Sequence, residues 1–273
     1  VDEGLVKVAP DAEKVDVHVY NTNIRKKLLM EIPLIAGKAR VSGDYAMPGI
    51  LQRGAMARVS IVAPGGEMTG KQLLLGLTTA IATDRKSYTV TFSDLINPFI
   101  FLDGTSVGLS GAESHKDVAA NQVVIDELNL IRDKMAVVAG MAKDEADARQ
   151  NKPSVPKIAV IAPAQDYVTT TGETIRKTEV DILIKALSMW KLHRTSPASG
   201  LYNLAAVCLM EGTVANALAG FPPGIREQMV RIGHPEGVVE VKVRLSADGT
   251  QVESIGMERT ARRIMKGELF IPA

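Results

Sequence analysis

A polar segment from residue 187 to residue 200 carries the side chains best suited to binding an anion. It reads Leu-Ser-Met-Trp-Lys-Leu-His-Arg-Thr-Ser-Pro-Ala-Ser-Gly, and it precedes a stretch of small and apolar residues, Leu201–Leu218, that predicts a buried helix. Ser199 is placed to cap that helix. Free N–H groups at a helix start, beside basic side chains and hydroxyls, bind carboxylates through hydrogen bonds and the helix dipole. The candidate substrate-binding residues of the segment are Ser188, Met189, Lys191, His193, Arg194 and Thr195.

Two interpretations of this segment stay open. One is a pocket for a di- or tricarboxylate. The other is an ordinary capped helix behind a solvated basic loop, because helix caps are far more frequent than ligand sites.

A second candidate is the stretch from Arg231 to Gly237, where two glycines and a proline predict a tight loop. It presents His234 beside Glu236, and histidine acts as acid, base or anion donor near neutral pH. The alternative is a turn at the entry of a strand, in which His234 packs and hydrogen-bonds locally. Turn chemistry alone favours that alternative.

Asn97 is a third candidate, because it precedes Pro98 between two predicted strands. A residue before proline is restricted to extended backbone, so its side chain points in a defined direction. Its amide can both donate to and accept from a substrate. A simple turn is the competing interpretation.

Metal, nucleophile and cofactor sites have no pattern in this sequence. The histidines have neither the i,i+4 spacing nor the adjacent cysteine pair of a zinc site. We find no phosphate loop, dinucleotide fingerprint or Gly-x-Ser-x-Gly elbow. Cys208 lies inside the apolar stretch, where a thiol is usually an inert small hydrophobe, so we reject it as a nucleophile. No metal and no cofactor are expected.

Composition excludes two classes of partner. The 273 residues carry 32 basic and 31 acidic side chains, a net charge of +1, so no field of one sign would attract nucleic acid or an anionic membrane. No apolar run reaches the length of a membrane span. A single cysteine and the lack of a secretory signal at Val1 favour a reducing, cytoplasmic setting.

The elements that would position these residues predict an α+β fold. Alternating apolar and polar residues predict strands with one solvated face, and the apolar run Lys157–Pro163 predicts a strand covered on both faces. Apolar residues at helical spacing predict a long helix within Lys116–Met141. The expected strands besides Lys157–Pro163 are Val15–Tyr20, Lys27–Ile32, Ala57–Val62, Ser87–Ser93, Phe99–Leu102, Val238–Leu245, Gln251–Gly256 and a last short strand, Glu268–Ile271.

Motifs along the whole chain resemble those of the PrpF family, the 2-methylaconitate isomerases and their relatives. They are Asp2-Glu3-Gly4-Leu5-Val6, Asn21-Thr22-Asn23, Pro64-Gly65-Gly66-Glu67-Met68-Thr69-Gly70, Asn97-Pro98, Gly108-Leu109-Ser110-Gly111-Ala112-Glu113, Pro156-Lys157-Ile158-Ala159, Ser188-Met189 and Glu258-Arg259-Thr260-Ala261-Arg262-Arg263-Ile264-Met265.

The resemblance implies an activity, a fold and a substrate class. The family moves a carbon–carbon double bond within small unsaturated di- or tricarboxylates such as methylaconitate, aconitate or methylitaconate, by proton transfer and without a cofactor. Its fold is the two-lobed one of diaminopimelate epimerase, with antiparallel and mixed sheets wrapped around central helices. Residues 1–82 with 254–273 would form the remainder of an incomplete first lobe, and residues 83–253 the second lobe.

The family's proton carriers, a lysine and a cysteine of the first lobe, precede the segment that matches Val1-Asp2-Glu3-Gly4-Leu5. We therefore expect no catalytic residue in this chain, which would be inactive alone. A homodimer or a separate N-terminal segment would cover the open first lobe. The alternative is a carboxylate-binding or structural homologue that has lost the proton carriers. Epimerase chemistry is less favoured, because no cysteine stands in the loop before Leu201.

Two departures from the family pattern concern the substrate. Family members commonly have serine where this chain has Glu236, and often two histidines and alanine where it has His193-Arg194-Thr195. A glutamate in an anion pocket would repel a carboxylate, whereas Arg194 would attract one.

Overall fold

The computed structural model describes residues 1–22, 25–48, 50–268 and 270–271, so Asn23 of the Asn21-Thr22-Asn23 motif lies outside the described residues. The expected strand Glu268–Ile271 is wrong for its described residues, which belong to no strand, and its Leu269 lies outside them. The fold is α+β and dominated by β-structure. Its strands are β1 (Lys14–Asn21), β2 (Lys26–Ile35), β3 (Lys38–Ala39), β4 (Ala57–Val62), β5 (Thr79–Ala82), β6 (Ser87–Asp94), β7 (Pro98–Asp103), β8 (Lys157–Pro163), β9 (Tyr167–Val168), β10 (Thr174–Ile175), β11 (Ile182–Ser188), β12 (Lys191–Leu192), β13 (Glu227–His234), β14 (Gly237–Leu245) and β15 (Val252–Arg259).

Nearly all the strands join one 13-stranded sheet in the order β1-β2-β4-β15-β14-β13-β11-β8-β7-β6-β5, with β12 beside β11 and β3 beside β2. β9 and β10 form a separate two-stranded sheet. The helices are α1 (His115–Ala120), α2 (Gln122–Val138), α3 (Glu145–Asn151), α4 (Ala198–Leu209), α5 (Val214–Ala219) and the 3-10 helices η1 (Gly104–Val107) and η2 (Lys177–Glu179).

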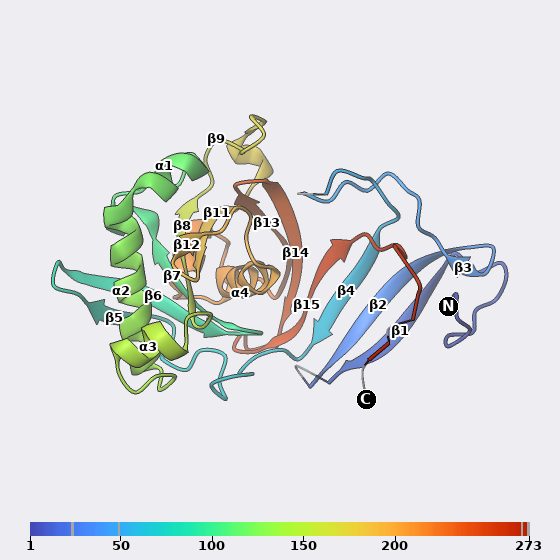
Figure 1. Cartoon of the computed structure of the whole chain (residues 1–273), viewed down its shortest axis with the longest axis horizontal. Helices are drawn as coiled ribbons and strands as arrows, with labels where there is room; N and C mark the ends of the chain where they lie inside the picture. The colour runs from blue at the N-terminus through green and yellow to red at the C-terminus, as the bar shows by residue number, and fades with distance from the viewer. Residues whose placement is uncertain (23–24, 49, 269, 272–273) are drawn as a thin grey trace.

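The central strands are covered on both faces, as β8 shows. Ala159 and Ile161 pack with α4 in one buried cluster, whereas Ile158 and Val160 pack with α2 in another. Successive side chains of a strand point to opposite faces, so a strand between two apolar layers is a continuous apolar run. The predicted strand Lys157–Pro163 is confirmed with the same bounds. In Figure 1, α4 lies inside the curve of the sheet and α2 lies outside it.

Both predicted long helices are interrupted. Asn121 ends α1, and its side chain accepts a hydrogen bond from the Val124 amide and so caps α2. The predicted helix Leu201–Leu218 is two helices, α4 and α5, because Gly212 adopts a left-handed φ of 87° between them. Thr213 caps α5 by accepting from the Asn216 amide.

The expected cap at Ser199 is wrong. Pro197 occupies the N-cap position of α4, no side chain caps the helix, and Ser199 lies within the first turn. Proline suits a helix start, because its fixed φ is compatible with entry and it has no N–H to satisfy. The first amides of α4 are therefore left without a side-chain partner.

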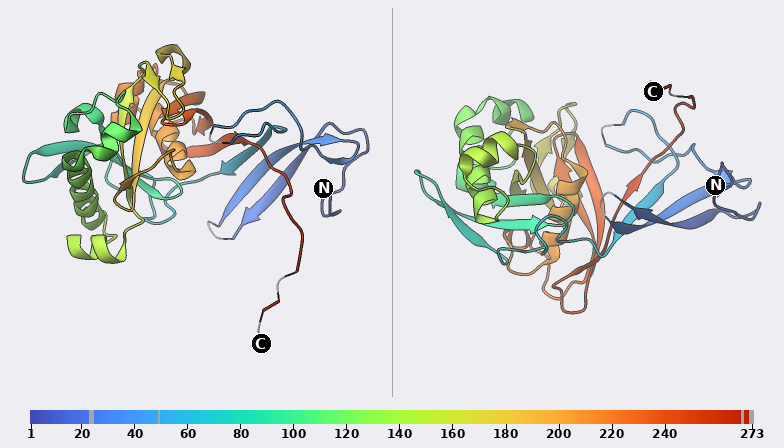
Figure 2. Two further views of the ribbon diagram at one scale, coloured as in Figure 1. Left: turned by 45° about the horizontal axis from the view of Figure 1, so that its top comes forward. Right: turned by 60° about the horizontal axis from the view of Figure 1, so that its bottom comes forward.

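The strands β1, β2 and β4 extend away from the helices (Figures 1 and 2). Among the described residues, no helix lies across β1 and β2 in these views. Val19, Tyr20 and Ile35 of these strands are exposed apolar side chains. Within the ranges given above, no helix has the length and apolarity required to cross a membrane.

Candidate functional site

The strands β12 and β13 pair with different parts of β11, and both pairings stop near its middle. β13 runs parallel to β11 and pairs with residues 182–183. β12 runs antiparallel to β11 and pairs with residues 187–188. Ile184 and Lys185 lie between the two pairings, so the segments that follow β12 and end β13 converge on them.

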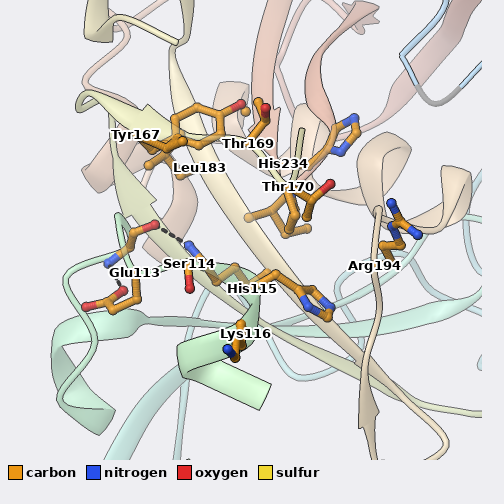
Figure 3. Close-up of a pocket in the computed structure, with 16 residues that line it drawn as sticks. Glu113, Ser114, His115, Lys116, Tyr167, Thr169, Thr170, Leu183, Arg194 and His234 are labelled. Atoms are coloured by element: carbon orange, nitrogen blue, oxygen red, sulfur yellow. Dashed lines mark hydrogen bonds between the residues drawn. The ribbon is translucent and has the colours of Figure 1, made fainter. Parts of the chain in front are cut away.

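A cavity of about 440 Å³ opens at this convergence. Its wall comes from the strand ends, from residues 111–116 at the start of α1, and from residues 167–170 around β9. Figure 3 shows Glu113, His115, Arg194 and His234 on different sides of the same space. The structure thus brings together residues that are far apart in the sequence.

Lys185 is a buried cation in the wall of this cavity. Its neighbours Ile184 and Ala186 pack with α4, so alternation along the strand places Lys185 on the opposite face of the sheet. The residue is only 6% exposed, and Nζ donates to the carbonyl oxygen of Gly111. Burial lowers the pKa of Lys185 to about 8, although the negative charge of Glu113 opposes this shift.

His234 is the last residue of β13 and is 4% exposed. Its Nδ1 accepts a hydrogen bond from the Glu236 amide at 3.2 Å, so the proton of the neutral ring lies on Nε2. The pKa of His234 is lowered to about 4, mainly by burial and to a smaller extent by His193, against the opposing effect of the Glu236 charge. His234 is therefore neutral at pH 7 and offers an N–H donor instead of a positive charge.

The predicted tight loop from Arg231 to Gly237 is wrong in most of its length, because residues 231–234 continue β13. Ile232 is fully buried against α4, and Arg231 forms an ion pair with Asp181. These contacts favour the extended strand over a loop. Only residues 235–236 form the turn to β14, so the alternative in which His234 packs and hydrogen-bonds locally describes the structure.

Arg194 and Glu236 form an ion pair across the cavity rim. Nε of Arg194 donates to Oε1 of Glu236 at 2.7 Å, and the Thr170 hydroxyl donates to the same oxygen. These hydrogen bonds from Thr170 and Arg194 lower the pKa of Glu236 below its ordinary value. The Glu236 side chain is 9% exposed and that of Arg194 is 73% exposed. The carboxylate is thus neutralised by a partner of this chain.

The start of α4 lies on the other face of β11. His193 donates its backbone N–H to Ala186, and its Nδ1 accepts from the backbone N–H of Thr195 at 3.2 Å. The hydroxyl of Ser196 is buried and has no hydrogen-bond partner among the described residues. With no side-chain cap on α4, this end of the helix retains free N–H donors suited to a carboxylate.

Asn97 is connected to α4 by a hydrogen bond from Asn203, a fully buried residue of that helix. The side-chain amide of Asn203 donates to the carbonyl oxygens of Asn97 and Ser199, and its oxygen accepts from the Leu95 amide. Asn203 therefore fixes the turn between β6 and β7 against the helix start. The half-buried Asn97 is held beside α4 by its backbone.

Three other predicted residues lie at the far end of the β11–β12 hairpin. Ser188 pairs with Lys191, and Met189 and Trp190 form the turn with φ of 52° and 64°. The predicted polar loop is therefore a hairpin up to residue 192. Ser188 and Met189 line a small crevice with Arg132, and the exposed Lys191 lines neither this crevice nor the cavity.

The sequence interpretation missed several residues of the cavity, which are Lys185, Glu113, His115, Tyr167 and Thr170. Lys185 had a signal, because it is the one charged residue in the apolar run Ile182–Leu187. Within the described ranges, no group of three or more histidine, cysteine, aspartate or glutamate side chains is arranged to hold a metal ion.

Comparison with known proteins gives strong matches over nearly the whole chain. The family model described as PrpF protein matches residues 1–272. The chain is 33% identical to the 3-methylitaconate isomerase of Eubacterium barkeri, in a match that covers 99% of this chain and 70% of the relative. It is 28% identical to the 2-methyl-aconitate isomerase of Shewanella oneidensis, covering 100% of this chain and 70% of that protein.

The fold is shared as well. The crystal structure of a methylitaconate-delta-isomerase superposes with a TM-score of 0.89 at 32% identity, covering 97% of this chain and 68% of that one. The motifs, the fold and the length of the match agree, and the chain belongs to the PrpF family.

Proposed function

We propose that this chain forms the substrate-binding part of an isomerase that shifts a carbon–carbon double bond in a small unsaturated di- or tricarboxylate. The substrate type is that of methylaconitate, aconitate or methylitaconate. The observation that carries the proposal is the uncapped start of α4 beside His193 and Arg194, in a chain whose relatives are named methylitaconate and methylaconitate isomerases.

The helix start and its neighbours can bind a carboxylate in two ways. The free amides of α4 donate hydrogen bonds, and the helix dipole favours a negative charge at that end. Arg194 adds a cation, and the side chain of Asn97 can donate to or accept from the substrate. Donors fixed in this way also stabilise the dienolate that forms when an allylic proton leaves, because its charge spreads onto the carboxylate.

Proton transfer itself requires an acid/base pair that these residues do not supply. Cys208 is fully buried, and burial raises the pKa of its thiol well above the ordinary value. His234 is buried, and its pKa of about 4 makes it a weak base. In the proposal the lysine and cysteine of the family stand on polypeptide outside this chain, the reaction uses no cofactor, and the chain alone binds the acid without converting it.

The same proposal assigns the chain to two lobes. Residues 1–82 with 254–273 belong to a first lobe, and residues 83–253 form a second lobe of the diaminopimelate epimerase type. The exposed apolar side chains on β1 and β2 support this division, because such a surface needs a covering layer. A separate N-terminal segment or a second copy of the chain supplies that layer. A cytoplasmic setting suits the single, buried Cys208.

The test is conversion of methylitaconate and trans-aconitate by the protein expressed from its whole gene, followed by proton NMR in buffer with a chelator and no added cofactor. We expect movement of the double bond in at least one acid, and binding without conversion by residues 1–273 alone. Binding without conversion by the whole protein would instead support a homologue that has lost its proton carriers.

A further inference from the structure

The hydrogen-bonding capacity of Lys185 is largely unfilled. An ammonium group has three N–H donors. Within the described part of the chain, Nζ donates only to the carbonyl oxygen of Gly111, and no carboxylate forms an ion pair with it. A buried charge without a partner is unfavourable, so such a group is normally paired or bound to a ligand.

The acidic neighbour of Lys185 is already occupied. Glu113 accepts hydrogen bonds from the amides of Ser110 and Gly111 and from the Ser110 hydroxyl. Burial raises the pKa of Glu113, but these bonds outweigh burial and lower it below its ordinary value. Glu113 is therefore an anion held by the loop, and two N–H donors of Lys185 have no acceptor among the described residues.

The cavity next to Lys185 has a further donor and room for a ligand. Nε2 of His115 is buried and lacks a hydrogen-bond partner among the described residues. The volume of about 440 Å³ lies in the range of small-molecule pockets. Tyr167 and Leu183 add apolar wall for a carbon skeleton.

From this arrangement we infer that the cavity on the face of the sheet opposite α4 binds a small organic carboxylate, with its carboxylate on Lys185 and its other end toward His115. This binding is additional to the substrate contacts at the start of α4 and does not depend on the isomerase reaction.

Competitive acylation with mass spectrometry tests the inference on the folded wild-type protein, with succinate as the probe. A bound carboxylate favours the ammonium form, which does not react, so succinate should slow the labelling of Lys185. Lys242, which pairs with Glu227 on β14, serves as the internal control and should label at an unchanged rate. Labelling of Lys185 that succinate leaves unchanged would overturn the inference.

Calorimetry on variants provides a second test. We expect Lys185→Met to weaken succinate binding by about tenfold or more, whereas Lys242→Met binds like the wild type. Equal binding by Lys185→Met would contradict the inference. If Lys185→Met does not fold, the labelling result on the wild type decides. If the protein binds succinate through Lys185 but isomerises no acid, the proposed reaction is excluded and the inferred binding site stands.

Discussion

Nε of Arg194 lies 2.7 Å from Oε1 of Glu236, and this contact joins the segment after β12 to the turn between β13 and β14. The two residues are also two departures from the common family pattern. Considered separately, one would attract a substrate carboxylate and the other would repel it. In the ion pair the positive charge of Arg194 and the negative charge of Glu236 largely cancel. Glu236 therefore weakens the attraction of Arg194 for a ligand carboxylate.

Replacing Glu236 by glutamine should therefore strengthen binding of an unsaturated dicarboxylate. The variant removes the competing charge from Arg194, and we expect Kd to fall by about three- to tenfold, a change of roughly 1 kcal/mol. Arg194→Ala should raise Kd. Calorimetry with methylitaconate measures both effects. Glu227→Gln, which removes the carboxylate of the remote pair with Lys242, is the control; tighter binding by the control, or weaker binding by Glu236→Gln, would exclude this role.

His234 should make the protein sensitive to acid. Burial lowers its pKa to about 4 from an ordinary 6.5, so between these values the unfolded state binds the proton and the folded state does not. Stability then falls as pH drops from 6.5 toward 4, by at most about 3 kcal/mol. His234→Asn, whose side-chain oxygen can replace Nδ1 as acceptor, should lose this dependence.

Urea unfolding at a series of pH values measures that difference. The exposed His18→Asn is the control and should keep the wild-type pH dependence. Parallel pH curves for His234→Asn and the wild type would show that His234 does not carry the effect.

Gly200 and Ser199, neighbours in the first turn of α4, should differ in their sensitivity to alanine, and Ser199 should not show the loss expected of a helix cap. A Cβ at Gly200 would lie 2.6 Å from Cζ of the fully buried Phe99, so Gly200→Ala should destabilise the protein by about 1–3 kcal/mol. Ser199 caps nothing, and Ser199→Ala should change stability by less than about 0.5 kcal/mol. Chemical denaturation checks both values. A larger loss for Ser199→Ala than for Gly200→Ala would contradict the structure at this helix start.

The hairpin turn at Met189 should be improved by asparagine. Met189 has a φ of 52°, a left-handed conformation that asparagine tolerates better than methionine. We expect Met189→Asn to stabilise the protein by about 0.5–1 kcal/mol and to raise Tm. Met68→Asn, at another exposed methionine, should give no gain. A lower Tm for Met189→Asn would show that contacts of the methionine side chain outweigh the backbone strain.

Local patterns were sufficient to predict many strands but not their order. The bounds of β4 and β8 could be predicted from the local sequence. A strand with one solvated face alternates apolar and polar residues, and a strand buried on both faces is a continuous apolar run. The pairing of β11 with β12 is a local hairpin, but its pairing with β13 joins residues about 50 positions apart. No local pattern records such a pairing, so the site at the convergence could not be predicted from the sequence.

The individual site residues divide in the same way. His193, Arg194 and His234 stood out by type, but the contact of Arg194 with Glu236 spans 42 positions and appears only in the fold. Ser188 and Met189 were grouped with them by sequence proximity, whereas the hairpin places them at its opposite end. Nothing in the local sequence around Asn203 indicates its role, because its hydrogen bond to Asn97 joins residues that are far apart in the sequence.

Solvent-deuterium incorporation tests the proposed proton transfer most directly. The protein expressed from the whole gene would be incubated with methylitaconate or trans-aconitate in D2O, and the recovered acids followed by NMR. Proton-transfer isomerisation predicts deuterium at the carbon that is reprotonated in the product, and none in acid incubated with residues 1–273 alone. Isomerised product that carries no solvent deuterium at that carbon would contradict proton exchange with solvent as the mechanism.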